Sequence, residues 1–348
     1  MKFKIALIGF GNVGQGFAQL LEAKRDYLSE NYGVEFLIVA ISDTVKGSVF
    51  QEEGIDLKRA IELVKKNGDL KSYDGGIIGW DSFKTISESN ADVIIEVTPT
   101  NITTAEPALS HIKLAFEVGR HVITTNKGPV ALFYRQLKEM ADEKGLAFKF
   151  EGTVLSGTPV FSFYFNSLRG AFVKRIRGIL NGTTNFILTQ MHKGESYDEA
   201  LETARKLGYA EADPSADVKG FDAMAKIIIL SNVIMGSNLK PSDVEVEGIT
   251  NITSERIREA VLNERKIKLI SEVWRDGDNF KAIVSPRELT KDDFFYHIDG
   301  TMNAICFSTD VIGDVFVTGP GAGGVETGYA ILSDLLDIYL SVYSGKER

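Results

Sequence analysis

The chain has 348 residues, of which 44% are hydrophobic and 25% are charged, a composition typical of soluble globular proteins. The net charge of −9, from 39 basic and 48 acidic residues, argues against nucleic acid or an anionic membrane surface as a partner. A single cysteine, Cys306, excludes an intrachain disulfide, and the four histidines show no metal-ligand spacing. The chain has no apolar run of membrane-spanning length and starts with a strand pattern, not a signal peptide, so we expect a cytoplasmic protein.

The first predicted strand, residues 4–8, runs directly into Gly9-Phe10-Gly11-Asn12-Val13-Gly14, and a helical pattern follows. A strand, the spacing G-x-G-x-x-G and a helix in this order form the dinucleotide-binding fingerprint. Gly9 permits a tight turn, Gly11 lets a pyrophosphate approach the backbone, and Gly14 lets the helix lie close to the strand. The helix N-terminus offers unpaired N–H groups and a positive dipole end to the phosphates. We therefore expect these six residues to bind NADP or NAD.

A second predicted strand, residues 36–41, ends at Ser42 and Asp43. An acid at this position normally bonds the ribose 2′-hydroxyl of the adenosine, which favours NAD. Lys46 is close enough in sequence to neutralise a 2′-phosphate instead, so NADP stays open. Asp43 also suits the role of a helix cap or turn residue.

Three further predicted strands, residues 91–97, 121–125 and 146–150, alternate with predicted helices at 105–118 and 132–143. This alternation predicts a doubly wound α/β domain with a parallel sheet. Ligands of such sheets bind beyond the carboxyl ends of the strands, where the first two of these strands deliver Thr98 and Lys127. Lys127 is therefore a candidate functional residue, with a solvated surface lysine as the alternative.

From Glu151 onward the pattern changes. A loop of small residues, 151–159, precedes a strand at 173–180 and a polar segment, 181–185, that could bind a small ligand. Helices are expected at 186–192 and 197–207. Paired strands are expected at 266–274 and 280–286, and again at 298–307 and 310–318. A glycine cluster, 319–324, then opens a helix at 327–342, which suits a second approach to the cofactor. Residues 44–90 hold no motif, although 57–64 look helical.

The segment from Gly208 to Lys226 places several carboxylates in a loop that opens an apolar helix at 223–235. Asp222 and Lys226 are four residues apart and share one face of that helix. On an exposed helix such an ion pair contributes about 0.3–0.5 kcal/mol. In a helix that is apolar almost all round, however, a lysine must pair with an acid or line a cleft. We therefore interpret Lys226 as a proton-transfer residue.

These motifs together resemble homoserine dehydrogenase. The matching segments follow the family's order over nearly the whole chain: residues 9–14, 125–127, 151–159, 181–183, 208–226 and 321–323. The segment 208–226 is the most specific of them. The resemblance implies a Rossmann-type doubly wound domain over 1–150, to which a C-terminal helix, 325–348, returns. It also implies an α+β domain over 151–324 for substrate binding and dimerisation.

The implied activity is the NAD(P)-dependent interconversion of L-homoserine and L-aspartate 4-semialdehyde, in threonine and methionine biosynthesis. The family resemblance further implies a homodimer, in a short form without a C-terminal ACT domain or a fused aspartate kinase. Lys226 would exchange the proton of the substrate's terminal oxygen, and Lys127 would be a second catalytic or a positioning lysine. The implied substrate-binding residues are Glu211, Asp217, Asp222, Tyr209, Thr183 and Gly182, and Gly321 and Glu326 join Thr98 and Lys127 at the cofactor.

Family members often bind a monovalent cation, Na⁺ or K⁺, largely through backbone carbonyls of one loop. The matching positions are Glu151, Val154, Ser156 and Thr158, and Thr158 stands where a glycine is usual.

Other functions leave parts of the sequence unexplained. An aspartate-semialdehyde dehydrogenase needs a thiolate nucleophile, whereas Cys306 lies in an apolar strand and is typical of a core residue. A sugar or polyol oxidoreductase of similar plan does not account for the acidic segment. A non-catalytic dinucleotide sensor would not need the paired lysines and acids. Homoserine turnover distinguishes the sensor from the enzyme.

Overall fold

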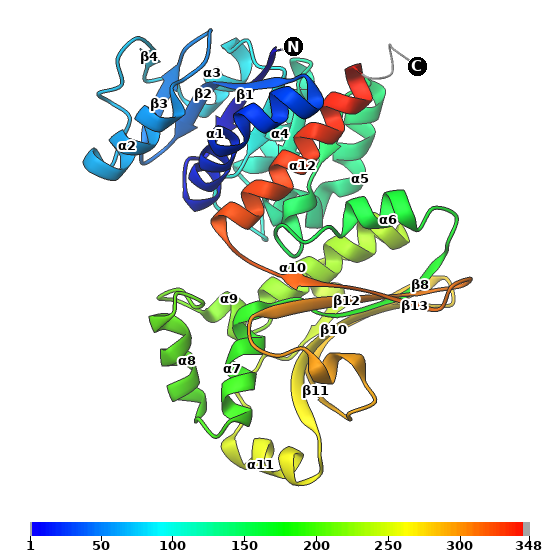
Figure 1. Cartoon of the computed structure of the whole chain (residues 1–348). Helices are drawn as coiled ribbons and strands as arrows, with labels where there is room; N and C mark the ends of the chain where they lie inside the picture. Colours follow the sequence, from blue (N-terminus) through cyan, green and yellow to red (C-terminus); the bar gives the residue numbers. More distant parts are fainter. Residues whose placement is uncertain (1, 344–348) are drawn as a thin grey trace. The chain divides into compact units, whose positions relative to one another are not determined.

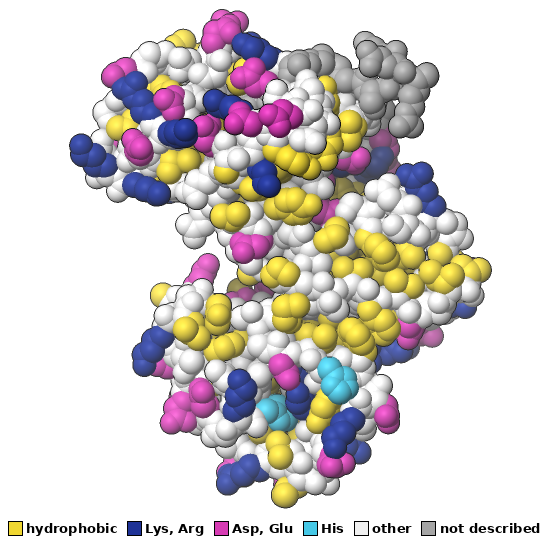
Figure 2. All heavy atoms as spheres, in the orientation of Figure 1, with side chains coloured by type: hydrophobic (Ala, Val, Ile, Leu, Met, Phe, Trp, Pro, Cys, Tyr) yellow, Lys and Arg dark blue, Asp and Glu magenta, His cyan; other side chains and the backbone are white. Residues whose placement is uncertain are grey.

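The computed structural model describes residues 2–343, and its contacts divide the chain into two compact units (Figure 1). Unit 1 is formed by the chain up to Gly157 together with the segment that starts at Gly323, and unit 2 by Thr158–Ala322. No helix within residues 2–343 is long and apolar enough to cross a bilayer. On the face drawn in Figure 2, basic and acidic side chains are interspersed over both units.

Unit 1 is built on a seven-stranded sheet with the order β4-β3-β2-β1-β5-β6-β7. The five strands from β2 to β7 in this order are parallel, and β3 and β4 extend the β2 edge in antiparallel fashion. Helices cover the parallel strands, which explains why these strands are continuous apolar runs. The strands are β1 (Lys2–Ile8), β2 (Glu35–Asp43), β3 (Gly47–Phe50), β4 (Ile77–Ile78), β5 (Val93–Glu96), β6 (His121–Thr124) and β7 (Phe148–Lys149).

The helices of unit 1 include the first and the last of the chain, which lie side by side (Figure 1). A Cβ at Gly16 would lie 2.4 Å from the carbonyl oxygen of Gly324, and one at Gly328 would lie 2.8 Å from the nitrogen of Phe17. Glycine on both helices is therefore what permits this contact. The helices are α1 (Asn12–Tyr32), α2 (Leu57–Asn67), α3 (Ser82–Glu88), α4 (Ala108–Glu117), α5 (Lys127–Glu143) and α12 (Gly324–Tyr343), with the short 3₁₀ turn η1 (Glu151–Thr153).

Some expectations for unit 1 need correction. The segment 44–90, expected to hold only one helix, also contains β3, β4 and α3. Helix α5 begins at Lys127 and not at Leu132, because Asn126 caps it by accepting the N–H of Gly128 at 3.2 Å. The backbone leaves helical geometry at Phe133, next to the expected start. Residues 344–348 of the expected C-terminal helix lie outside the described residues.

Unit 2 is built on a six-stranded sheet with the order β13-β12-β8-β10-β11-β9. Its neighbouring strands are antiparallel except β9, which runs parallel to β11. The two strand pairs expected from the sequence are confirmed as β10 with β11 and β12 with β13. The strands are β8 (Val173–Ile179), β9 (Val244–Val246), β10 (Lys266–Asp276), β11 (Asn279–Leu289), β12 (Met302–Thr309) and β13 (Asp314–Pro320).

The longer helices of unit 2 match the expected ones in place. Helix α8 starts at the expected residue, Tyr197, whereas α7 and α10 start earlier than expected. The polar segment 181–185, expected to precede the helix at 186–192, already contains the start of that helix, because Asn181 caps it by accepting the N–H of Thr184 at 2.8 Å. The helices are α6 (Phe161–Ser167), α7 (Gly182–His192), α8 (Tyr197–Lys206), α9 (Ser215–Val218), α10 (Phe221–Leu230), the π-helical turn η2 (Ser231–Met235) and α11 (Ser254–Leu262). Two 3₁₀ turns, η3 (Pro241–Asp243) and η4 (Phe294–His297), complete the unit. The predicted fold class, a Rossmann-type α/β domain with an α+β domain, is confirmed.

We predict that His192, at the end of α7, makes unit 2 sensitive to acid. Burial and the charges of Lys268 and Lys266 lower the pKa of His192 from 6.5 to about 4, and its Nε2 accepts the N–H of Ile267 at 2.8 Å. His192 therefore binds a proton more tightly in the unfolded chain than in the folded protein. Its contribution to stability is present above pH 6.5 and is lost as the pH falls towards 4.

The variant His192→Gln keeps an acceptor for Ile267 but does not titrate. Its unfolding free energy, measured by urea denaturation across this pH range, should fall less steeply than that of the parent. His297→Gln, at an exposed histidine, should keep the parent's slope. Equal slopes for parent and His192→Gln would contradict the prediction.

Candidate active site

The turn between β1 and α1 has the geometry that the glycine fingerprint predicts. Gly9 has a φ of +100°, and a Cβ there would lie 2.7 Å from the carbonyl oxygen of Val97. A Cβ at Gly14 would lie 2.5 Å from the carbonyl oxygen of Gly9. At Gly11, in contrast, an added Cβ would have no described neighbour within 4 Å. Packing thus requires Gly9 and Gly14, whereas Gly11 borders open space at a helix N-terminus, where a phosphate fits.

Asp43, at the end of β2, binds the backbone of this turn. Its Oδ2 accepts the N–H of Phe10 at 2.7 Å, and its Oδ1 accepts those of Val45 and Lys46 at 2.9 and 2.8 Å. Burial acts to raise the pKa of Asp43, but these backbone N–H groups and the charge of Lys46 together lower it. Asp43 therefore stays charged and joins the glycine turn to the β2–β3 turn.

The turns that follow β5 and β6 carry Thr98 and Lys127, and the structure brings these two turns together. The amide of Asn126 donates to the carbonyl oxygens of Thr98 and Pro99 at 3.1 and 3.3 Å. Because β5 lies between β1 and β6, these turns share the carboxyl edge of the sheet with Gly9. Lys127 is the first residue of α5, so its ammonium belongs to a helix N-terminus.

In unit 2 the expected pair of Asp222 and Lys226 is present on α10. Lys226 is only 7% exposed, and its Nζ lies 2.7 Å from Oδ2 of Asp222 and 2.7 Å from the carbonyl oxygen of Leu180. An ammonium has three N–H donors. Among the described residues these two acceptors take two of them, which leaves the third for a substrate oxygen.

Asn181 connects this pair to the acidic loop. Its Nδ2 donates to Oδ1 of Asp217 at 2.6 Å and to Oδ2 of Asp222 at 2.9 Å, while its Oδ1 caps α7. Asn181 belongs to the polar segment 181–185 that was expected to bind a small ligand, but its link to Asp217 and Asp222 was not expected. The available signal was an asparagine directly before a helix that starts with Gly182, a typical N-cap position.

The remaining predicted substrate residues lie near the same helix start or on the loop after α8. The Thr183 hydroxyl donates to the carbonyl oxygen of Tyr209 at 2.6 Å, and the Tyr209 ring packs on Phe186 with centroids 5.0 Å apart. Glu211, on the same loop, is exposed. A Cβ at Gly182 would lie 2.8 Å from the carbonyl oxygen of Thr301, so backbone packing already explains that glycine.

The two expected cofactor residues near the second glycine cluster fall in different units. Gly321, in unit 2, lies so close to Asn303 that a Cβ would come within 2.0 Å of its Oδ1. Glu326 lies in the first turn of α12 in unit 1, where its carboxylate packs against the backbone of Gly323.

The segment expected to bind a cation begins with Glu151, which lies against another buried acid of unit 1, Asp334 of α12. The N–H of Glu151 donates to Oδ2 of Asp334 at 2.9 Å, and both residues are buried. Burial and then the charge of Glu151 raise the pKa of Asp334 well above its usual value. Leu155 and Ser156 have φ of +56° and +53°, so the backbone turns sharply there.

Other members of that segment are placed differently. The Ser156 hydroxyl lies 2.8 Å from that of Thr327, and Val154 is buried. Thr158 belongs to unit 2 and donates to the carbonyl oxygen of Pro320 at 2.9 Å. Within residues 2–343 no three His, Cys, Asp or Glu side chains are grouped to hold a metal, so a cation would need backbone carbonyls.

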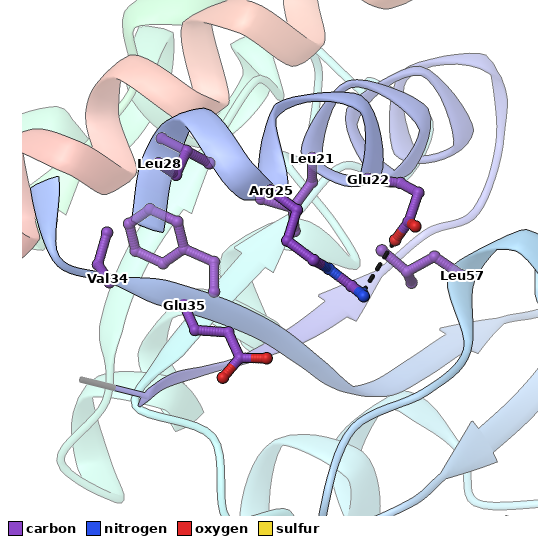
Figure 3. A pocket seen from close by; sticks show the side chains of 8 residues that line it. Leu21, Glu22, Arg25, Leu28, Val34, Glu35 and Leu57 are labelled. Carbon is purple, nitrogen blue, oxygen red and sulfur yellow. Dashed lines mark ion pairs between the residues drawn. The ribbon is translucent and has the colours of Figure 1, made fainter. Parts of the chain in front are cut away.

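A pocket on unit 1 lies away from these residues (Figure 3). It is found between α1 and the start of β2, where Arg25 reaches Glu22 at 2.9 Å. The start of β2 is at the amino edge of the parallel sheet, opposite the glycine turn, so this pocket is not the dinucleotide site. Its lining residues are Leu21, Glu22, Arg25, Leu28, Val34, Glu35, Phe36 and Leu57.

A glycine turn built for a dinucleotide, together with a buried lysine that has a donor to spare, defines a dinucleotide-dependent oxidoreductase. A family model described as homoserine dehydrogenase matches residues 159–336. The chain is 44% identical to a homoserine dehydrogenase of Methanocaldococcus jannaschii, over 97% of this chain and 98% of that protein. The chain therefore belongs to the homoserine dehydrogenase family, whose members are NAD(P)-dependent oxidoreductases that act on a CH–OH group.

Two further relatives bear on the cofactor. An NAD⁺-dependent homoserine dehydrogenase of Pseudomonas canavaninivorans is 39% identical, over 100% of this chain and 99% of that protein. A structure of a hyperthermophilic archaeal homoserine dehydrogenase in complex with NADPH is similar with a TM-score of 0.83 and 30% identity, over 98% of each chain.

We predict that Gly11→Val abolishes cofactor binding without unfolding the protein. The Cβ of the new side chain would have no described neighbour within 4 Å, and the side chain would occupy the space in front of the helix N-terminus. Fluorescence titrations with NADH and NADPH should show no saturation, while the melting temperature stays close to that of the parent. Gly14→Val is the matched comparison and should lower the melting temperature, because its Cβ meets the carbonyl oxygen of Gly9. Normal saturation of Gly11→Val would mean that this glycine has only a structural role.

Proposed function

We propose that the protein catalyses the reversible oxidation of L-homoserine to L-aspartate 4-semialdehyde with NAD(P), in threonine and methionine biosynthesis. The observation that carries this proposal is the buried ammonium of Lys226, held by Asp222 and Leu180 in a chain of this family. We also propose a cytoplasmic location, which fits a chain whose one cysteine, Cys306, is buried and has no second cysteine with which to form an intrachain disulfide.

Bound NAD(P) supplies or accepts the hydride. In the reducing direction the third N–H of Lys226 donates its proton to the aldehyde oxygen as the carbonyl carbon gains the hydride. In the oxidising direction Nζ takes the hydroxyl proton back. Asp222 and Leu180 fix the direction in which Nζ points, and Asn181 fixes Asp222.

Lys127 is assigned a different task. It lies in the first turn of α5, and helix N-termini favour anions over cations. Its ammonium adds positive charge at a place that already attracts an anionic group, such as the substrate carboxylate or a cofactor phosphate. We therefore assign Lys127 to positioning, and the proton transfer to Lys226.

The proposed cofactor residues are Gly9, Phe10, Gly11, Asn12, Val13, Gly14, Asp43, Thr98, Lys127, Gly321 and Glu326. Asp43 stays charged beside the glycine turn, which disfavours a 2′-phosphate and favours NAD. Lys46, in the next turn, has the opposite effect. The ratio of kcat/KM for NAD to that for NADP, measured in the parent, shows which cofactor is preferred. If Asp43 sets this preference, Asp43→Asn should shift the ratio towards NADP.

We further propose two features that the family resemblance implies. A monovalent cation near Glu151, Val154, Ser156 and Thr158 would offset the charge of a buried acid pair. Activity in Na⁺, K⁺ and tetramethylammonium buffers tests it, and equal rates would argue against the cation.

A homodimer through unit 2 would cover Phe294 and Phe316, which pack together and are each 38% exposed. Sedimentation equilibrium tests the dimer.

The proposed domain roles follow from these assignments. Residues 1–150 with the C-terminal segment 325–348 would bind the dinucleotide, and residues 151–324 would bind the substrate and form the dimer.

We predict that Lys226→Ala abolishes homoserine turnover but not cofactor binding. A general acid–base group contributes about 10²–10⁴-fold, so kcat should fall by that factor. Turnover is followed at the nicotinamide absorbance, and cofactor affinity by fluorescence. Lys219→Ala, at an exposed lysine of the same segment, is the control and should behave like the parent. Activity of Lys226→Ala within about threefold of the parent would remove the acid–base role.

We predict that Glu211→Gln weakens homoserine binding without affecting the cofactor. Glu211 is an exposed carboxylate on the loop of Tyr209 and can neutralise the substrate ammonium. The amide keeps the shape but loses a charge-assisted hydrogen bond, which is roughly twice as strong as a neutral one. KM for homoserine at saturating cofactor should rise, while Glu202→Gln on α8 should leave it unchanged. If KM and kcat of Glu211→Gln equal those of the parent, Glu211 does not bind the substrate.

A further inference from the structure

Glu96, the last residue of β5, is a fully buried carboxylate in the middle of the parallel sheet of unit 1. Its exposure is 0%, and its register partners are Ile8 of β1 and Thr124 of β6. Ile8 directly precedes the glycine turn. A buried carboxylate is costly unless it is well bonded, so its partners indicate its role.

One oxygen of this carboxylate binds the turn after β5. Oε1 accepts the backbone N–H of Thr98 at 3.2 Å and also the Thr98 hydroxyl. Both donors of a residue proposed to contact the cofactor are thus held by a single carboxylate oxygen. The orientation of the Thr98 side chain therefore depends on Glu96.

The other oxygen leads to the turn after β6. The Thr124 hydroxyl lies 3.3 Å from Oε2 and 3.0 Å from the carbonyl oxygen of Glu96, and it accepts the N–H of Asn126 at 3.0 Å. Asn126 in turn caps α5, whose first residue is Lys127. A continuous set of hydrogen bonds therefore runs from Glu96 to the helix start that carries Lys127.

A histidine closes the site behind the carboxylate. His111 of α4 is 2% exposed, its Nδ1 lies 3.6 Å from Oε1 of Glu96, and its Nε2 lies 2.8 Å from the Ser82 hydroxyl. The Phe83 ring packs against the imidazole with centroids 5.1 Å apart. Glu96 is thus enclosed on that side, and its hydrogen bonds are directed towards the two turns.

We propose that Glu96 is a positioning residue that sets Thr98 and the first turn of α5 for cofactor binding and catalysis. This rests on the proposed roles of Thr98 and Lys127. Because one buried carboxylate accepts hydrogen bonds from both turns, it fixes the positions of the two turns relative to each other. A displacement of about 1 Å in such a turn can cost about 10²-fold in rate.

The test compares variants of each part of this network in the full-length protein. Glu96→Gln keeps the shape and should lower kcat for homoserine about tenfold or more and raise the Kd of NAD(P)H. Thr98→Val removes the hydroxyl that donates to Oε1 of Glu96 and should mainly raise the cofactor Kd. Thr124→Val removes the hydroxyl that joins Glu96 to Asn126 and should mainly lower kcat, with a smaller rise in the cofactor Kd than Thr98→Val causes.

The double variant Glu96→Gln with Thr98→Val distinguishes positioning from general destabilisation. If Glu96 acts through Thr98, the cofactor Kd of the double variant stays within about twofold of the worse single variant, whereas independent effects multiply. Asp92→Asn is the matched control. Asp92 also accepts a backbone N–H, that of Lys4 at 2.8 Å, but at the opposite edge of the sheet, so kcat and Kd should not change.

Several results would overturn the proposal. One is a folded Glu96→Gln with kcat and Kd within about twofold of the parent, and another is full multiplication of the effects in the double variant. If Glu96→Gln does not fold, Thr98→Val and Thr124→Val test the proposal instead. The proposal is then refuted unless Thr98→Val acts mainly on the cofactor Kd and Thr124→Val mainly on kcat. A parent that does not turn over homoserine refutes the proposed function instead, and the cofactor titrations still test Glu96.

Discussion

A lysine ammonium inside an apolar helix is the constraint on which the arrangement of unit 2 depends. Removing that charge from water costs several kcal/mol unless it is paired and hydrogen-bonded. Asp222, one turn earlier on α10, and the carbonyl oxygen of Leu180, at the end of β8, provide the two partners. The end of β8 must therefore lie against α10, and the start of α7 follows directly from it. The requirement to satisfy Lys226 thus places the polar residues that surround it.

In unit 1 the controlling constraint is the close approach of backbones. The glycine turn can lie against the end of β5 only because Gly9 has no side chain, and α1 can lie against that turn only because of Gly14. The same reasoning applies to Gly16 and Gly328, where the first and the last helix of the chain meet. Glycines that look alike in the sequence therefore have different roles. Most of those in the fingerprint serve packing, and Gly11 alone borders open space.

The sequence was informative where the determinants are local. The fingerprint, the hairpin of β10 and β11, and the shared face of Asp222 and Lys226 depend on periodicity and spacing over a few residues, and all are present. Asn181 was missed because its partner Asp222 is 41 residues away, and no local pattern records that contact. The start of α5 was missed because its cap was interpreted as part of a loop. In the sequence Glu96 is a single polar residue in an apolar strand. Its hydrogen-bond donors come from two different turns, which no local pattern shows.

The carboxylates of this protein divide by what they bind, and this division bears on which of them meets the substrate. Asp43 and Glu96 accept backbone N–H groups of turns at the cofactor edge, so their lone pairs serve geometry. Asp222 accepts the lysine ammonium and the Asn181 amide, so displacing either by a substrate ammonium would leave a buried donor unpaired, which is costly. Glu211 is exposed and can bind an incoming cation without breaking such a network. The buried acids are thus suited to holding neighbouring groups in place, which supports the proposal that Glu211 recognises the substrate ammonium.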